Sequence, residues 1–83
     1  MLDITERAAA VVRQSQEAAR RFNPDARIRL IRAAAGLAFE LTDVADAADT
    51  ELDCLGTALL VAEGIDGTID TGDHNAPVLL PTP

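Results

Sequence analysis

The chain has 83 residues, a formal net charge of −7, one cysteine and no aromatic residues other than two Phe. This length predicts one small domain over residues 1–83 with a thin aliphatic core, so oligomerisation would add stability. A single cysteine excludes a disulfide within the chain and fits a reducing cytoplasm. The acidic balance argues against nucleic acid and against an anionic membrane as partners, because both require clustered positive charge.

Charge divides the chain into two unequal parts. Residues 1–32 hold all seven arginines and four acidic residues, whereas residues 33–83 hold ten acidic residues and no Lys or Arg. We expect these charges to form a solvated surface; the alternative is that the two parts pair within one molecule or across a dimer. The start of the chain lacks the basic residues of a signal peptide, and no run approaches the ~18 apolar residues of a membrane span. The expected location is therefore the cytoplasm.

In chain order, the first long element is an amphipathic helix from about Thr5 to Phe22. Thr5 is of a type that caps helix N-termini, and Glu6 follows it at the positive end of the helix dipole. Small and apolar residues recur at steps of three and four up to Phe22, while the arginines fall mainly on the other face. Asn23 and Pro24 then end the helix, because Pro cannot continue it.

Short strands follow the helix, and "MLDIT" before it predicts a further strand or an extended lead-in. "ARIRLIRA" alternates with period two but slips at Ile31, which predicts a β-bulge or a strand covered on both faces. "LAFELTD" alternates cleanly, "TELDC" and "TALLVAE" flank a turn at Leu55 and Gly56, and one short strand is expected around Thr68–Thr71. "VLL" is the last expected strand. The expected fold class is α+β and mainly β, with one N-terminal helix packed on a compact antiparallel β-sandwich.

The segment "DVADAADTE" predicts an acidic loop between two of these strands. Its carboxylates do not have the spacing of a calcium-binding loop, and neither do the later aspartates. We therefore expect all of these acids to be solvated: Asp43, Asp46, Asp49, Glu51, Asp53, Asp66, Asp70 and Asp73.

Cys54 and His74 are the only residues with soft or borderline metal-ligand side chains. A closed zinc site takes about four ligands, and an iron–sulfur cluster takes about four thiolates or thiolates with imidazole, which is more than one chain offers. Such a site would require a two-fold dimer. The simpler expectation is that Cys54 is a small buried hydrophobe and that His74 is an exposed turn residue. No phosphate loop, dinucleotide fingerprint, serine elbow or Cys–His pairing is indicated, so an enzyme is not expected.

Several segments, taken in order, have a familiar pattern. "MLDITERAAAVV" follows the form M-hydrophobic-x-hydrophobic-T-x-x-A before a helix, and "RIRLIRAAAGLAFELTD" follows the form strand, glycine-containing turn and strand. Residues 36–39 fit G-hydrophobic-x-aromatic, and "DTELDCLGTALLVAEG", "IDGTID" and "VLLP" supply the later segments. Together, over residues 1–81, they resemble the HesB/IscA-like family, the A-type iron–sulfur carriers.

The resemblance implies a single HesB-like domain and a setting in iron–sulfur protein biogenesis. Members of that family hold iron or a [2Fe–2S] cluster with three cysteines, one in a G-C-S-G turn and two in a C-G-C near the C-terminus. In this sequence the position of the first cysteine falls at about Ala34, and the C-G-C has no counterpart. Cys54 corresponds to none of the family's three cysteines. Alanine offers no ligand atom, so neither a cofactor nor a bound metal is expected.

The resemblance, with its missing ligands, thus leads us to expect a non-catalytic relative that keeps the scaffold and acts through protein–protein interaction. Its partner would be an iron–sulfur assembly protein, a cluster-receiving protein or a second copy of the chain. The alternative is a protein that binds iron or an iron–sulfur cluster through Cys54 and His74 across a homodimer.

Overall fold

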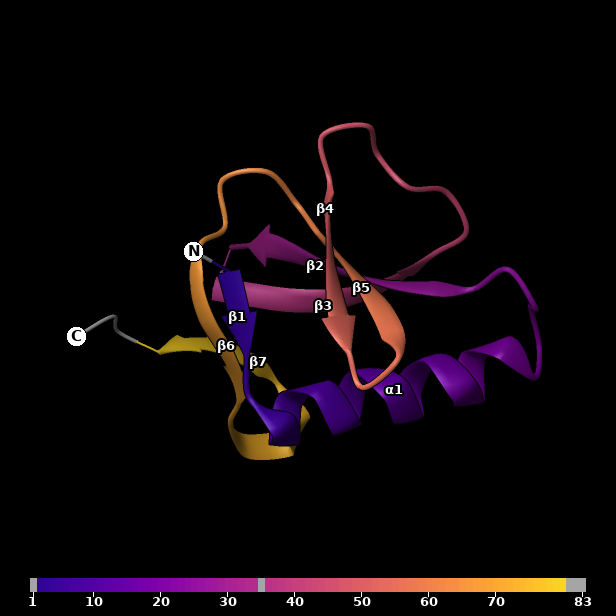
Figure 1. Ribbon diagram of the computed structural model, residues 1–83, viewed down its shortest axis with the longest axis horizontal. Helices are drawn as coiled ribbons and strands as arrows, with labels where there is room; N and C mark the ends of the chain where they lie inside the picture. Colours follow the sequence, from indigo (N-terminus) through magenta and orange to yellow (C-terminus); the bar gives the residue numbers. More distant parts are fainter. Residues whose placement is uncertain (1, 35, 81–83) are drawn as a thin grey trace.

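The computed structural model describes residues 2–34 and 36–80, which form one α-helix, one short 3₁₀ helix and seven strands (Figure 1). The elements that the sequence predicts are present in the predicted order, so the fold class is α+β and mainly β. In chain order they are β1 (Leu2–Ile4), α1 (Glu6–Arg20), β2 (Arg27–Ala33), β3 (Gly36–Thr42), β4 (Thr50–Cys54), β5 (Thr57–Val61), β6 (Gly67–Thr71), η1 (Asp73–Asn75) and β7 (Pro77–Leu80).

The strands form two sheets, with the orders β1-β6-β7 and β3-β2-β5-β4. Strands that follow one another directly in the chain pair antiparallel, namely β2 with β3, β4 with β5, and β6 with β7. By contrast, β1 with β6 and β2 with β5 pair in parallel, so the expectation of an antiparallel arrangement is wrong at these two contacts. The reason is that whole elements separate the two strands of each parallel pair, and parallel neighbours require such long connections.

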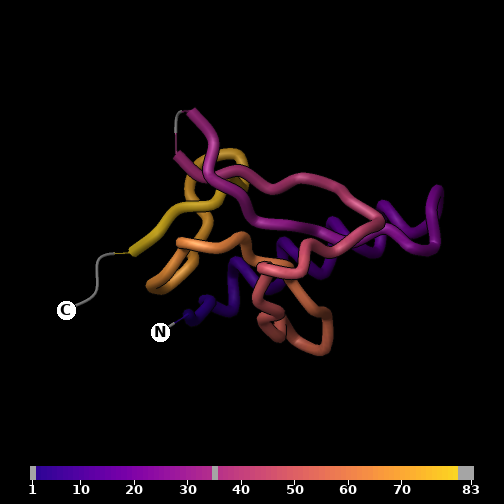
Figure 2. The backbone as a smooth tube through the Cα atoms, turned by 90° about the horizontal axis from the view of Figure 1, so that it is seen from above, coloured from indigo at the N-terminus to yellow at the C-terminus, as the bar shows by residue number. Residues whose placement is uncertain are grey.

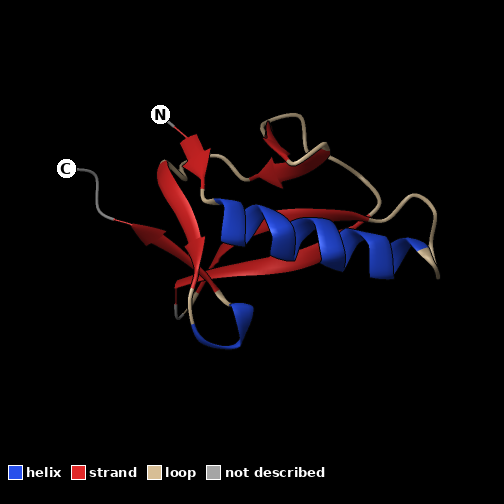
Figure 3. Cartoon of the chain, turned by 60° about the horizontal axis from the view of Figure 1, so that its bottom comes forward, coloured by secondary structure: helices blue, strands red, loops and turns tan. Residues whose placement is uncertain are grey.

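One hydrophobic core joins α1 to both sheets, and Figure 3 shows the helix lying across the strands. The helix contributes mainly small side chains to this core, from Ala8, Ala9 and Val12. Both sheets supply the larger ones, so the core is aliphatic, as the composition predicts. Its fully buried large side chains are Leu30, Leu59, Leu60, Ile69, Val12, Val61 and Cys54.

The first turn of α1 is attached to β6. The Thr5 hydroxyl caps the helix by accepting a 3.2 Å hydrogen bond from the Ala8 N–H, as the sequence predicts, and it donates a 2.7 Å bond to Oδ1 of Asp70. Arg7 donates to both carboxylate oxygens of Asp70, at 3.3 and 2.8 Å. The Thr5 N–H donates a further bond of 2.9 Å to the carbonyl of Ile69. The bonds from Arg7 first, and then from Thr5, lower the pKa of Asp70 to about 2.

Strands β2 and β3 pair residue against residue over their whole length. This unbroken register contains no bulge, so the β-bulge considered at Ile31 is wrong. β2 has one buried face, which carries Ile28 and Leu30, and one half-buried face, which carries Arg29 and Ile31. The apolar pair at residues 30 and 31 thus reflects a strand partly covered on its second face.

The two oppositely charged parts of the chain pair with each other inside the molecule. Arg29 donates 2.9 Å hydrogen bonds from Nε and Nη2 to the two oxygens of Asp49, and a third bond of 3.4 Å to Glu40. The Asp49 side chain is only 1% exposed, and the bonds from Arg29 lower its pKa. The expectation of a wholly solvated acidic loop is therefore wrong at Asp49, because Arg29 replaces the water that this carboxylate loses. The expectation of a solvated carboxylate is also wrong at Asp70, which is buried and is held by Thr5 and Arg7. Further ion pairs between the two parts are Arg7–Asp70 and Arg27–Glu51.

The helix α1 ends slightly before the predicted position. Its last helical residue is Arg20, and Arg21 is the C-cap, so Phe22 lies in the turn that follows. With 15 residues, α1 is too short to cross a bilayer, and no other helix in the described ranges is long and apolar enough to do so.

Replacing Asp70 with Asn should lower the free energy of unfolding at neutral pH, because a neutral amide holds Arg7 and Thr5 less strongly than a carboxylate does. The pKa of Asp70 in the folded protein is about 2, below the ordinary 3.8, so this stabilisation is complete above about pH 4 and is lost as the pH falls toward 2. Urea unfolding near pH 7, 4 and 2 measures this contribution to the free energy of unfolding. The difference between the native protein and D70N should shrink as the pH falls.

The matched control is Asp53→Asn, which changes an exposed carboxylate that forms no ion pair with any described residue. It should change the stability little at any of the three pH values. A D70N difference of constant size from pH 7 to pH 2 would contradict the role given to the ionised carboxylate.

Candidate functional site

Ala34 lies in the exposed turn between β2 and β3. Gly36 closes this turn with a φ of 134°, in a region that residues with a side chain rarely adopt. The predicted order of a strand, a turn and a second strand is therefore confirmed. The methyl side chain of Ala34 carries no lone pair, so the position that resembles the family's first cysteine offers no metal ligand.

Cys54 ends β4 and has a side chain that faces the core, with 0% of the residue exposed. Its Sγ lies 3.6 Å from the carbonyl oxygen of Leu52. Burial, and then the nearby charge of Asp53, raise the pKa of the thiol to about 11. The thiolate is the form that binds metals and attacks electrophiles, so Cys54 is held in its inert form. The expectation of a small buried hydrophobe is confirmed at this position.

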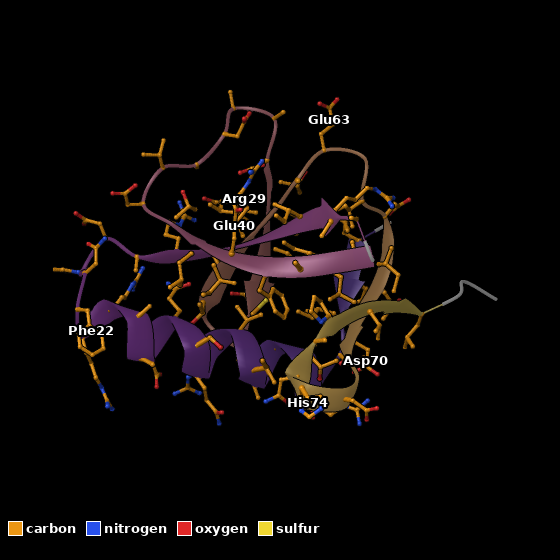
Figure 4. The ribbon with its side chains drawn as sticks, turned by 180° about the vertical axis from the view of Figure 1, so that it is seen from behind. Phe22, Arg29, Glu40, Glu63, Asp70 and His74 are labelled. Carbon is orange, nitrogen blue, oxygen red and sulfur yellow. The ribbon has the colours of Figure 1, made fainter. Side chains whose placement is uncertain are left out.

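His74 lies in η1, the short connection between β6 and β7, and it is exposed as predicted. Its φ of 58° places it in the left-handed region. Figure 4 shows His74 near Asp70 at the lower edge of the molecule. Cys54 faces the core and His74 faces solvent, so the structure does not bring the two together as a ligand pair.

Ala34, Cys54 and His74 do not fit the iron or [2Fe–2S] cluster that the resemblance implies for the family. Over residues 2–34 and 36–80, no group of three or more His, Cys, Asp or Glu side chains is placed to hold a metal ion. Ala34 lacks a ligand atom, and Cys54 would have to leave the core to reach a second chain.

An apolar groove runs between the second half of α1 and β3. Its volume is about 410 Å³, and its lining residues are Ser15, Ala18, Ala19, Phe22, Ile28, Phe39, Glu40 and Leu41. A second cavity of about 240 Å³ continues it beyond the helix end and is lined by Ala19, Phe22, Asn23, Ala26, Leu41 and Thr42. The two cavities share three of these residues, and we refer to them together as the α1–β3 groove.

Both aromatic residues of the chain line the α1–β3 groove. Phe39 is half-buried and packs against the core, whereas Phe22 is 92% exposed and Leu41 is 64% exposed. Figure 4 shows Phe22 at the outer end of α1, far from His74 and Asp70. An aromatic side chain exposed to this extent beside an apolar groove marks a surface suited to binding.

The groove exists because α1 packs closely only as far as Gln16. The buried residues of the helix end at Gln16, and Figure 2 shows the second half of α1 extending away from β6 and β7 toward the opposite end of the molecule. The small side chains of Ala18 and Ala19 leave the space between this half and β3 unfilled. On β3, the Glu40 side chain forms an ion pair of 3.4 Å with Arg29, on the strand face opposite to Phe39 and Leu41.

The sequence pattern places Phe22 at the end of an apolar helix stripe and Leu41 in an alternating strand, but it does not predict that the two share an exposed surface. The sequence does contain a feature that indicates an exposed Phe22. Phe22 stands directly after Arg20 and Arg21 and directly before "NP", where a chain leaves its helix and is usually exposed. An aromatic residue in such a place lacks neighbours that would bury it.

A third cavity, of about 720 Å³, lies between the β2–β3 turn and β7, beside the position of Ala34. Its lining is made of backbone and small or apolar side chains, apart from Arg32. Arg32 donates a 3.0 Å hydrogen bond to the carbonyl of Gly64. The described residues that line this cavity supply no thiol, imidazole or carboxylate, so it lacks the means to hold a metal.

No protein-family model matches this sequence, no curated protein is detectably similar to it, and no solved structure matches its fold.

The thiol of Cys54 should be unreactive in the folded protein. Because it is buried and its pKa is raised to about 11, modification by Ellman's reagent at pH 8 should be at least about 100-fold slower than in 6 M guanidinium chloride. Cys54 is the only cysteine, so the absorbance change reports this site alone. The control is Leu55→Cys in a Cys54→Ala background, which places a thiol at an exposed neighbouring position and should react quickly. Equal rates for the two thiols would show that Cys54 is accessible.

Anaerobic incubation with ferrous iron and sulfide, followed by desalting, should leave the protein colourless. The reason is that Ala34 has no ligand atom and Cys54 is buried. Absorbance between about 300 and 600 nm, together with metal analysis, is the measurement. A stoichiometric chromophore that disappears in both Cys54→Ala and His74→Ala would overturn this expectation and support ligation across a homodimer.

Proposed function

We propose that this protein is a non-catalytic, HesB/IscA-like binding domain that acts by docking another protein in the α1–β3 groove. The observation that carries the proposal is the placement of the chain's two aromatic residues. Phe22 and Phe39 both line this groove, and Phe22 is 92% exposed. Aromatic side chains next to a preformed apolar pocket are the usual anchors of protein interfaces.

The dimensions and lining of the groove support a protein ligand. Its two cavities, of about 410 and 240 Å³, have room for a few side chains of a partner. Aliphatic and aromatic carbon dominates the lining, and Glu40 is the one charged lining residue in the described part of the chain. Because Glu40 is already paired with Arg29, the groove favours an apolar segment over a charged small molecule.

The titratable groups with shifted pKa values support a binding role over catalysis. Arginine hydrogen bonds lower the pKa of Asp49 and of Asp70, so both carboxylates stay ionised near neutral pH and serve as structural anions. Burial keeps Cys54 protonated. Each of these shifts moves the group away from the pKa near 7 that suits a general acid or base.

The setting in iron–sulfur protein assembly is part of the proposal and rests on the sequence resemblance. The order of β1, α1, β2, turn and β3 agrees with the element order that the resemblance implies. With Ala34 in the turn, the chain would provide the scaffold and the docking surface, and its partner would be an iron–sulfur assembly protein or a cluster-receiving protein. No observation favours the alternative site at Cys54 and His74.

Site-specific crosslinking tests the docking surface. Phe22 is replaced with p-benzoyl-phenylalanine, and the variant is irradiated inside cells that produce the protein. Adducts of defined mass should form at position 22, and Leu41→Asp should abolish them because it places a charge in the apolar groove. The matched control is the same photoreactive residue at Leu55, which is also exposed, at 52%, but lies on the β4–β5 turn. Absence of any adduct at position 22, or identical adducts at positions 22 and 55, would overturn the proposal.

A further inference from the structure

We propose that the α1–β3 groove binds an extended segment of a partner protein, which pairs with β3 as an added strand of the four-stranded sheet. This inference rests on the proposed function, since it names the kind of ligand that the same groove takes. Three features of the described residues carry it: an outer strand with a free backbone edge, a helix end that covers the space beside this strand, and a difference in character between the two faces of the strand.

β3 is an outer strand of its sheet, and one of its two backbone edges is free. Among the strands that the structure describes, only β2 pairs with it. In an antiparallel pair, every second residue directs its N–H and C=O groups toward the partner strand, and the residues between direct theirs away from it. About half of the backbone groups of Gly36–Thr42 therefore point outward. An extended chain is the ligand that satisfies such a row of donors and acceptors.

The other three outer strands in the described ranges have features that oppose strand addition, whereas β3 does not. β1 has three residues, β7 has four and begins with Pro77, and β4 carries Glu51 and Asp53 among its five. Short length, proline and charge are means by which proteins keep an edge strand from pairing. β3 has seven residues in unbroken register with β2, and Glu40 is its one charged residue. Its edge is therefore the one best suited to a further strand.

The second half of α1 covers the space into which a strand beside β3 would fit. Three successive residues of β3 line the groove, namely Phe39, Glu40 and Leu41. Because successive side chains of a strand point to opposite faces, a groove lined by all three reaches the backbone of the strand. On the helix side stand Phe22, which is 92% exposed, and the alanines of the last turns. An added strand would thus pair with β3 and place alternate side chains against Phe22 and these alanines.

The two faces of β3 determine the sequence pattern of the segment. Phe39 packs against the core with Leu41 on the same face, and Glu40 lies on the opposite face beside Arg29. An added strand continues both faces, so its residues alternate between apolar and polar. The Glu40 side chain is 42% exposed, so it has room for a second cation besides Arg29. A Lys or Arg of the segment next to Glu40 would form a favourable cross-strand pair.

Selection from a phage library of random peptides of about 12 residues tests the proposal. The native protein is the target, and L41D removes peptides that bind elsewhere, because it places a charge in the apolar groove. Enriched peptides should alternate apolar and polar residues over about five positions or more, with Lys or Arg among the polar ones. Phe22→Ala should weaken their binding about tenfold or more, because it removes an aromatic anchor. Leu55→Ala, on the β4–β5 turn, should leave it unchanged.

The three substitutions replace exposed side chains, so circular dichroism should show that each variant is folded. An enriched peptide that binds F22A or L41D as well as it binds the native protein would show that it does not occupy the groove. A selection that yields only such peptides would overturn the proposal.

Backbone methylation of an enriched peptide identifies the strand pairing itself. N-methylation of an amide that faces β3 should weaken binding about tenfold or more, because it removes a backbone hydrogen bond and adds a methyl group at the edge. N-methylation of the next residue, whose amide points away from β3, should change the dissociation constant less than about twofold. In the protein, amide hydrogen exchange measured by NMR should slow at alternate residues of β3 when the peptide is bound. The amides of β4, the other outer strand of the sheet, serve as the control and should be unaffected.

The outcomes separate this inference from the proposed function. Peptides that require Phe22 but tolerate methylation at every position, with no slowing of exchange in β3, would overturn strand pairing, and docking in the groove would stand. A library that yields no enriched peptide would overturn the extended segment as ligand. In that case the crosslink at position 22 decides the proposed function separately, and both proposals fail if this crosslink is also absent.

Discussion

The carboxylate of Asp70 fixes the start of the helix to the three-stranded sheet. It lies on β6, the central strand of the three-stranded sheet, and it holds the start of α1 through Thr5 and Arg7. β1 pairs in parallel with the same strand, so both the segment before the helix and its first turn are fixed to β6. The helix is therefore directed across the strands, with Ala8 and Val12 turned toward the core.

The same attachment explains why the end of the helix is open. A helix of 15 residues is about 22 Å long, and its buried residues end at Gln16, before its last turn. Small residues pack closely near Asp70, whereas farther along the helix the side chains of Ala18 and Ala19 are too short to fill the space above β3. The two Phe side chains border this space. The α1–β3 groove thus follows from where the helix is fixed and from how small its inward residues are.

Local patterns in the sequence predicted the elements of this fold well. Thr5 as N-cap, the turn at Leu55 and Gly56, and the strand near Thr68–Thr71 each depend on a few adjacent residues, and each is confirmed. The parallel pairs depend on segments distant in the chain, so local patterns could not predict them. Burial of Asp49 required knowing that Arg29 lies opposite it, and the groove required knowing where α1 ends relative to β3.

One consequence follows from the position of β3 as the outer strand of its sheet. Alternate residues of a strand point to opposite faces, yet Glu40 lines the groove together with Phe39 and Leu41. The Glu40 side chain pairs with Arg29 on the face opposite to Phe39 and Leu41, so the groove reaches the backbone of this outer strand. An uncovered strand edge flanked by apolar side chains is a template on which further strands can add without limit, as in amyloid. An occupant of the α1–β3 groove that also covered this edge would protect the protein against such strand addition.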